Sequence, residues 1–298
     1  MVLHAVLALA PHASPTVPAA LRTAWQHPER PTRYPLGHAI VTSLADIRTP
    51  EATAIVIELL PHLEAQLRYE AVARLTRTTG KPFGGDVAAW SEWWQAAEGR
   101  LPQLTEPASE ALPRDLKWPQ PLPKFCGIPI YAKRVVFVVE HSQGVMGTVG
   151  GKPRLETVQD ELSAAIKRLP EDVSFNLVAF NDRVERWQPS LVVADSANKA
   201  AAIQAAYRLS GTGRAAMFDA IESAFTLEDN IEQVLLVSTG KPTAGKIVDR
   251  RVIVEPVVAL NQHRRIRLDT FGVAANAQGE ETLKRLATRS FGDYLKFP

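Results

Sequence analysis

The sequence predicts an α/β fold in residues 127–298, with a doubly wound, mostly parallel, six-stranded sheet of the Rossmann type, preceded by a small all-α domain in residues 1–98. Three observations predict this organisation. Residues 135–139 are a continuous apolar run rich in valine, which is typical of a parallel strand buried on both faces. From Gly127 onward such runs alternate with amphipathic helical patterns, which indicates right-handed crossovers between parallel strands. Residues 1–98 show helical patterns only.

The helical region carries clear start and stop signals. Thr49-Pro50-Glu51 supplies an N-cap, a first-turn proline and an early acid, and Gly80 is placed as a C-cap. Apolar positions of two helix pairs recur roughly 31 residues apart, for example Val41 with Val72. This is the pattern of a short α-solenoid. The predicted helices cover residues 1–10, 15–27, 35–47, 50–62, 66–78 and 86–98.

Two helix pairs are few for a solenoid, because each repeat buries its apolar face only against its neighbours. We therefore expect residues 1–10 and 86–98 to complete the stack. Trp90, Trp93 and Trp94 lie at i, i+3 and i+4, a spacing that favours a packing seam over a ligand cage. Residues 99–126 are rich in proline, which keeps a helix from running through them, so they are predicted to be an extended linker.

The α/β region divides into alternating strands and helices. Residues 181–182 are predicted to turn the chain into a short edge strand, and residues 135–139 and 233–238 are predicted to be buried strands. The predicted strands are 135–139, 174–180, 184–187, 233–238, 267–273 and 293–297, and the predicted helices are 155–169, 197–209, 217–225, 252–261 and 281–288.

A polar segment, Glu140-His-Ser-Gln-Gly144, follows the first buried strand directly. In open α/β sheets, ligands bind outside the carboxyl ends of the strands. A carboxylate, a hydroxyl and a glycine in one loop at that edge therefore predict a ligand-binding loop.

Several stretches, taken in order, resemble the von Willebrand factor A domain over the whole of residues 127–298. They are Ile128-Pro-Ile-Tyr-Ala-Lys-Arg-Val-Val-Phe-Val-Val, Phe175-Asn-Leu-Val-Ala-Phe-Asn, Met217-Phe-Asp-Ala-Ile, Val234-Leu-Leu-Val-Ser-Thr-Gly-Lys-Pro-Thr, Arg267-Leu-Asp-Thr-Phe-Gly-Val and Leu283-Lys-Arg-Leu-Ala. The front half is similar to the HEAT-like segments that precede such domains in some bacterial proteins. Gly80-Lys-Pro-Phe-Gly-Gly-Asp-Val-Ala-Ala-Trp-Ser-Glu-Trp-Trp resembles the motif that closes those segments.

The resemblance implies a metal-ion-dependent adhesion site, in which three loops hold one Mg²⁺ ion. The first loop of the family, Asp-x-Ser-x-Ser, is here Glu-x-Ser-x-Gly: Glu140 replaces the aspartate, Ser142 matches, and Gly144 replaces the second serine. In the second loop, Ala215 stands at the position of the metal-binding threonine, and Thr212 lies three residues earlier.

The third loop has Thr239 in place of the second aspartate, followed by Lys241. Mg²⁺ requires a near-octahedral set of oxygen ligands, so each lost oxygen matters. We therefore expect a degenerate site, lined by Glu140, Ser142, Gly144, Ala215 and Thr239, that holds no metal or other cofactor. If a Mg²⁺ ion were bound, Glu140, Ser142 and Thr239 would be its ligands.

The resemblance and these departures predict a non-enzymatic protein that binds a protein partner. Its contact surface would be the helical face or the loops of residues 140–152, 210–217 and 239–246. Two alternatives stay open. The first is Mg²⁺-dependent ligand binding, and the second is RNA binding similar to that of Ro-type particles, which would require a ring of many repeats and a basic inner face.

Composition and the remaining motifs exclude other classes. A net charge of +2 argues against a nucleic-acid partner, and no apolar run approaches the roughly 18 residues of a membrane helix. Residues 1–10 lack the cationic start of a signal peptide, so we expect a cytoplasmic location. One cysteine, Cys126, excludes an internal disulfide.

The remaining short motifs do not indicate catalysis or nucleotide binding. His141 and Ser142 are adjacent but do not match a hydrolase elbow. The glycines of residues 147–151 do not match a phosphate loop. Arg264 and Arg265 lie at a helix end, where cations complement the helix dipole.

Overall fold

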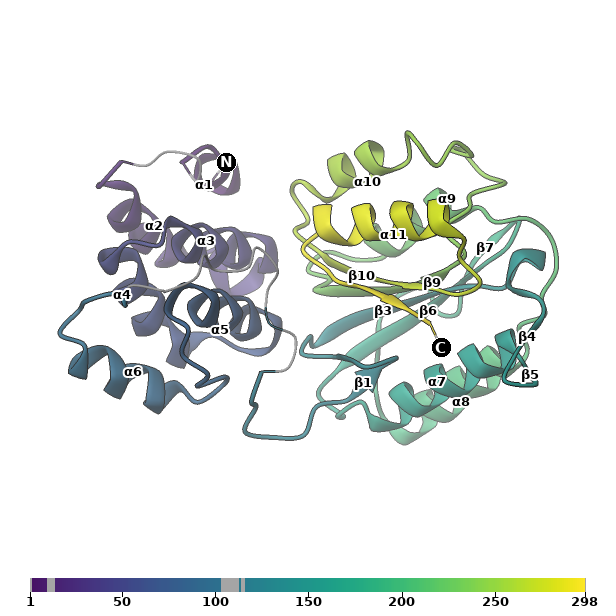
Figure 1. The fold of residues 1–298 in the computed structure, drawn as a ribbon, viewed down its shortest axis with the longest axis horizontal. Coiled ribbons are helices and arrows are strands. Elements are labelled where there is room, and N and C mark those ends of the chain that lie inside the picture. Colours follow the sequence, from purple (N-terminus) through teal and green to yellow (C-terminus); the bar gives the residue numbers. More distant parts are fainter. Residues whose placement is uncertain (1, 10–13, 103–112, 114–115, 298) are drawn as a thin grey trace. The chain divides into compact units, whose positions relative to one another are not determined.

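The computed structural model describes residues 2–9, 14–102, 113 and 116–297. The chain divides into two compact units, Met1–Leu122 and Pro123–Pro298. In its described residues the first unit has helices and no strand, and the second is an α/β domain, as the sequence predicts (Figure 1).

The described helices of the first unit agree closely with the predicted ones. They are α1 (Val2–Leu9), α2 (Val17–Trp25), α3 (Tyr34–Ile47), α4 (Pro50–Leu59), α5 (Ala65–Thr79) and α6 (Val87–Ala96), with 3-10 turns η1 (Arg30–Thr32) and η2 (Leu60–His62). The Thr49 side chain accepts a hydrogen bond from the Ala52 N–H as the N-cap of α4, and Gly80 ends α5 in the left-handed conformation.

These helices pack as two rows. α2, α4 and α6 contact one another in succession, and so do α1, α3 and α5. Helix α1 thus extends one row and α6 extends the other, as expected for a completed stack. Trp90 is fully buried in the core of this unit, and Trp93 and Trp94 pack against that core, so the tryptophan stripe is a packing seam. The assignment to HEAT repeats remains a prediction.

The described residues of the predicted linker, residues 99–126, are attached to the two units and do not form a separate extended segment. The carbonyl of Lys117 accepts a hydrogen bond from the Gly85 N–H at 2.8 Å, which attaches residue 117 to the turn before α6. Farther on, β1 (Lys124–Phe125) pairs with β2 (Ile128–Pro129), and Phe125 is buried in the α/β core. The α/β unit therefore begins before residue 127.

The main sheet has the strand order β11-β10-β9-β3-β6-β7. Five strands run parallel to one another: β3 (Arg134–Glu140), β6 (Ser174–Phe180), β9 (Gln233–Ser238), β10 (Arg267–Gly272) and β11 (Tyr294–Lys296). The edge strand β7 (Val184–Arg186) is antiparallel to β6. All six predicted strands are present.

The strand count itself was too low. A further short strand, β8 (Val192–Val193), pairs with β6 and makes the sheet seven-stranded within the described residues. A small hairpin of β4 (Thr148–Val149) and β5 (Lys152–Pro153) follows the 3-10 turn η3 (Gln143–Val145). Both were missed because two-residue strands show no periodic pattern.

Helices cover both faces of the sheet (Figure 1). One core contains side chains of α7 (Arg154–Arg168) and α8 (Ser196–Tyr207). The opposite core contains side chains of α9 (Met217–Phe225), α10 (Val254–Asn261) and α11 (Ala277–Arg289). Among the described residues, no helix has the length and apolarity that crossing a bilayer demands.

The sheet register places the candidate site. Val139 of β3 pairs with Val237 of β9, so Glu140 and Ser238 are the next residues at the carboxyl ends of two adjacent parallel strands. The sequence pattern had predicted both strands, and parallel pairing brings their ends to one edge.

Gly84 offers a test of how residue 117 is attached. Its φ is +57°, and a Cβ there would lie 1.9 Å from the Lys117 carbonyl oxygen. We expect Gly84→Ala to lower the free energy of unfolding of the helical unit by at least about 2 kcal/mol. The alanine would have to adopt a left-handed backbone conformation, and its Cβ would be forced against the Lys117 carbonyl oxygen. Gly99→Ala is the matched control, because its φ is +71° but its Cβ would meet only Trp94 at 3.9 Å. Urea unfolding of both variants measures the difference, and equal losses would contradict the contact.

Candidate functional site

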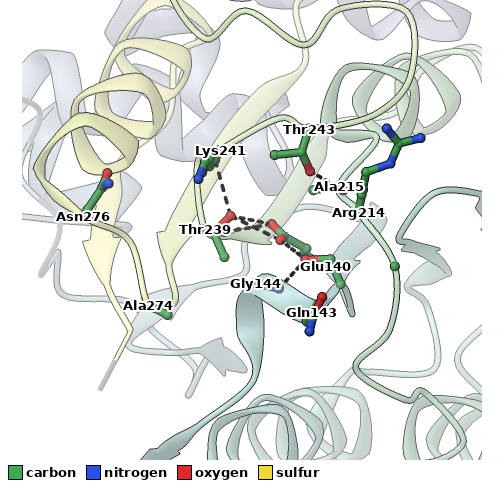
Figure 2. A pocket seen from close by; sticks show the side chains of 12 residues that line it. Glu140, Gln143, Gly144, Arg214, Ala215, Thr239, Lys241, Thr243, Ala274 and Asn276 are labelled. Atoms are coloured by element: carbon green, nitrogen blue, oxygen red, sulfur yellow. Dashed lines mark hydrogen bonds between the residues drawn. The ribbon is translucent and has the colours of Figure 1, made fainter.

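A pocket of ≈ 570 Å³ opens at the carboxyl edge of the sheet, between the loops after β3, before α9 and after β9. All five residues predicted as site residues line it (Figure 2). Its lining consists of Glu140, Ser142, Gln143, Gly144, Gly213, Arg214, Ala215, Thr239, Lys241, Thr243, Ala274 and Asn276.

The carboxylate of Glu140 lies at the centre of the site and is fully buried. Its Oε1 accepts a hydrogen bond from Ser142 Oγ at 2.6 Å. Its Oε2 accepts from Ser238 Oγ at 2.6 Å and from the Thr239 N–H at 2.8 Å. Thr239 Oγ1 lies 3.2 Å from both oxygens. A carboxylate offers about four acceptor sites, so these donors satisfy it.

The three hydroxyls share one local geometry. Each also accepts a hydrogen bond from the backbone N–H two residues later: Ser142 from Gly144 at 3.0 Å, Ser238 from Gly240 at 3.1 Å and Thr239 from Lys241 at 3.3 Å. Such local side-chain-to-backbone bonds favour turns over regular structure. They fix each hydroxyl in the loop that carries it, so the donors are preorganised around Glu140.

Little space remains beside this carboxylate. A Cβ on Gly144 would lie 3.2 Å from Ser142 Oγ, 3.2 Å from Thr239 Cγ2 and 3.4 Å from Glu140 Oε1. Gly240, with φ of +68°, packs directly on Gly279 of α11, where a Cβ would be 2.3 Å from the Gly279 carbonyl oxygen. The loop after β9 is therefore held in place from both sides.

The loop before α9 brings a methyl group to the pocket. Ala215 is buried, and its N–H donates to Thr243 Oγ1 at 2.8 Å. Its carbonyl accepts from the N–H groups of Thr243 and Ala244 at 2.9 and 3.0 Å. Thr212, three residues earlier in this loop, is not part of the lining. Ala215 therefore lines the pocket, and its equivalence to the metal-binding threonine of the family stays a prediction.

Two cations line the rim, and they differ in their contacts. The Arg214 guanidinium points away from Glu140 (Figure 2), and its Nε donates to Asp182 Oδ1 at 3.0 Å. The Arg214 N–H also donates to Asp182, and these bonds hold the pKa of this carboxyl below its ordinary value. The Lys241 side chain is exposed, and its ammonium has no hydrogen bond or ion pair among the described residues.

Other candidate groups are used elsewhere. His141 Nδ1 lies 2.9 Å from the Ser210 carbonyl oxygen, and the Ser142 hydroxyl is bonded to Glu140, so the two do not form a nucleophilic pair. Burial raises the pKa of the Cys126 thiol, which disfavours the reactive thiolate. Across the described residues, no three His, Cys, Asp or Glu side chains gather closely enough to hold a metal ion.

Ser238, Thr243 and Asn276 belong to the site but were not singled out from the sequence. Ser238 is the last residue of a buried strand, and a polar residue at that place is the signal that could have identified it. Thr243 and Asn276 lie in loops without a local pattern, and only folding brings them to the pocket. Asn276 is also the N-cap of α11.

Residues 133–295 match the family model of the von Willebrand factor type A domain. The chain belongs to this family. The match covers more than half of the chain, and the sheet order with helices on both faces agrees with the fold expected from the resemblance.

Similar proteins match part of this chain. Inter alpha-trypsin inhibitor heavy chain 4 of Mus musculus is 28% identical over 130 residues, which are 40% of this chain and 13% of that protein. The human von Willebrand factor A domain-containing protein 3A is 26% identical over 180 residues, 55% of this chain and 15% of that protein. The chain thus spans a small part of the relatives that it matches.

Solved structures also align with part of this chain. A von Willebrand factor type A protein from Catenulispora acidiphila aligns with a TM-score of 0.45 and 17% identity, over 57% of this chain and 40% of that one. The PilB minor pilin from Streptococcus sanguinis aligns with a TM-score of 0.43 and 15% identity, over 57% of this chain and 59% of that one.

The Asp182–Arg214 contact predicts a measurable titration. Because the pKa of Asp182 is lowered in the folded state, its stabilising effect is present above the ordinary aspartate pKa and is lost as the pH falls through the lowered value. We expect Arg214→Ala to raise this pKa only part of the way, since the backbone N–H bond remains. Carboxyl NMR titration measures it, with Arg183→Ala as control. An unchanged pKa in Arg214→Ala would contradict the contact.

Proposed function

We propose that this von Willebrand factor A-like domain binds a protein partner through the rim of its pocket, without a metal ion and without catalysing a reaction. The rim consists of residues 140–152, 210–217 and 239–246. One observation carries the proposal: the carboxylate of Glu140 is already satisfied by donors from the chain itself.

The residues of the pocket do not fit a Mg²⁺ ion. Mg²⁺ requires near-octahedral oxygen ligands at about 2.1 Å and gives up its water reluctantly. To ligate it, Glu140 would have to exchange hydrogen bonds with Ser142, Ser238 or Thr239 for a metal bond. Ala215 supplies no oxygen from its side chain, and Thr239 supplies a hydroxyl where a second carboxylate would be needed to balance the charge.

The rim chemistry favours a protein contact. Lys241 presents an unpaired cation, and Gln143 and Asn276 add neutral amides around a polar pocket. Loops on a rigid sheet edge are where binding residues are commonly placed.

RNA binding has less support. Arg264 lies 3.9 Å from Asp229, and the Arg265 guanidinium lies 4.4 Å from the centroid of the Phe291 ring. Both cations are thus engaged within the domain. The six described helices of the first unit form one short stack of two rows and not a ring.

Thermal unfolding tests the metal-free proposal. We expect millimolar MgCl₂ to change the melting temperature of the intact chain by less than about 1 °C relative to EDTA. A metal bound at 100 times its Kd would add about 2.7 kcal/mol, or roughly 5–10 °C. A rise of that size, lost in Glu140→Ala, would show that Glu140, Ser142 and Thr239 hold a metal. Calorimetric titration of the unmodified chain with Mg²⁺ gives the same answer if that variant does not fold.

A pull-down tests the rim. The tagged intact chain, presented to a lysate in EDTA with nuclease, is expected to retain a protein partner, and Lys241→Glu is expected to reduce its recovery at least about fivefold by reversing a rim charge. Lys199→Glu, on α8 away from the pocket, is the matched control.

Three results would each count against the proposal. Capture that requires Mg²⁺ would favour the metal-dependent alternative, and capture abolished by nuclease would favour RNA. Equal recovery with both charge variants would place the contact away from the rim.

A further inference from the structure

Lys241 is a cation of the pocket that has no counterion among the described residues. The described lining contains one acid, Glu140, and two cations, Arg214 and Lys241. Glu140 is fully buried and hydrogen-bonded by hydroxyls of the chain itself, and the Arg214 guanidinium is engaged by Asp182. The charge that the pocket offers to a ligand is therefore that of the Lys241 ammonium.

The backbone of Lys241 is fixed, while its side chain is exposed. The Lys241 N–H donates to Thr239 Oγ1 at 3.3 Å. Gly240 packs on Gly279 of α11, and Pro242 is buried, so the residues on both sides are held by the domain. A ligand can thus meet the ammonium without breaking an ion pair and without reordering the loop, which keeps the cost of binding low.

Two neutral side chains of the lining each retain an unused donor. Asn276 Oδ1 accepts from the Gly279 N–H at 2.9 Å, so the NH₂ group of Asn276 has no acceptor in the described structure. The Thr243 hydroxyl accepts from the Ala215 N–H at 2.8 Å, and its own proton has no acceptor among the same residues. Gln143 adds an exposed amide. Such donors favour a ligand that carries acceptor oxygens.

The N-terminus of α11 favours the same kind of ligand. Ala274 and Asn276 line the pocket and directly precede this 13-residue helix. The positive end of a helix dipole stabilises anions near the first turn. Glu280 is the acid in that turn, and its carboxylate is paired with Lys284 and Lys296. The free ammonium and the helix end therefore both favour an anion.

One free cation matches a ligand group with a single negative charge. A carboxylate carries one such charge, and its two oxygens can accept from the ammonium and from neutral donors together. A phosphate monoester carries about −1.5 to −2 charges and is commonly bound by arginine forks. The arginine of this lining, Arg214, instead donates through Nε to Asp182. The pocket thus fits a carboxylate better than a phosphate.

The size of the pocket favours a carboxylate that belongs to a larger molecule. The volume is ≈ 570 Å³, whereas one water molecule occupies about 30 Å³ of liquid. A free acetate ion would leave most of the pocket to water. An acidic side chain on a protruding segment of a protein brings further atoms that can fill the remaining space.

We propose that the pocket binds an Asp or Glu side chain of the partner protein, with Lys241 as its counterion and no metal ion between them. This rests on the proposed function and names the chemical group that the rim recognises. The contact weakens with added salt and does not respond to EDTA, because it depends on an ammonium group. Lys241 also determines specificity, since Asn or Gln in place of the acid leaves the ammonium unpaired.

Short peptides presented to the immobilised intact chain in EDTA test this assignment. The peptides are blocked at both ends and carry Asp, Glu, Asn or Gln at the centre of otherwise randomised, non-acidic sequences. We expect an acidic pool to bind at least about tenfold more tightly than the matching amide pool. Lys241→Met should remove this preference and Lys241→Arg should retain most of it. Lys199→Met, on α8 and outside the lining, should bind as the unmodified chain does.

Other outcomes would overturn the inference. They are equal binding of acidic and amide pools, and an acidic preference that persists in Lys241→Met. Tighter binding of a phosphopeptide pool, of peptides with a free C-terminal carboxylate or of acetate alone would assign the pocket to that ligand instead. An acidic preference that appears only when Mg²⁺ replaces EDTA would show that a metal ion lies between the two groups.

The failure of this inference differs from the failure of the proposed function. If Lys241→Glu abolishes partner capture but Lys241→Met does not, the rim remains the contact surface, and the loss comes from repulsion and not from a missing ion pair. The proposed function then stands and this inference fails. Binding of the acidic pools through Lys241, without capture of any partner, would support the carboxylate site and contradict the proposed protein contact.

Discussion

The hydrogen bonding of the Glu140 carboxylate is the constraint on which the site depends. An ionised carboxylate is costly to bury unless its oxygens are hydrogen-bonded. Glu140 meets that condition with hydroxyls from the ends of two adjacent strands, so the same bonds that satisfy the charge also connect the loop after β3 to the loop after β9. The site is built around a buried carboxyl group whose oxygens are hydrogen-bonded.

The donors around the Glu140 carboxyl group are neutral hydroxyls and a backbone N–H. Each hydroxyl oxygen accepts a hydrogen bond from a backbone N–H. This bond orients the hydroxyl so that its own proton is directed to Glu140. Donors oriented in advance stabilise a charge without reorganisation. The rim of the pocket can therefore carry a charge of its own, and Lys241 contributes a positive charge there.

Much of the fold could be predicted, because a pattern of apolar residues that extends over many positions distinguishes a helix from a strand. The strands Ser174–Phe180 and Gln233–Ser238 and the helix Met217–Phe225 have the predicted bounds. The family's motif spacing led to Glu140, Ser142 and Ala215, and all three line the pocket. Thr243 and Asn276 could not be found, since their place depends on how loops fold over the sheet edge. The strand at Val192–Val193 is too short for any period to reveal, and the strand at residue 124 was hidden by the prolines around it.

The attachment of Lys117 to the turn at Gly84 and Gly85 has a consequence for modularity. The last helix of the first unit ends at Ala96, yet the turn that precedes this helix is completed by a carbonyl some twenty residues beyond it. A fragment cut at the end of α6 would leave the Gly85 N–H without its acceptor and would uncover the surface of Gly85 against which Trp118 lies. The structural unit that contains these helices therefore extends at least through residue 118. Recombination between such proteins would keep this unit intact only if the exchange point lies after that residue.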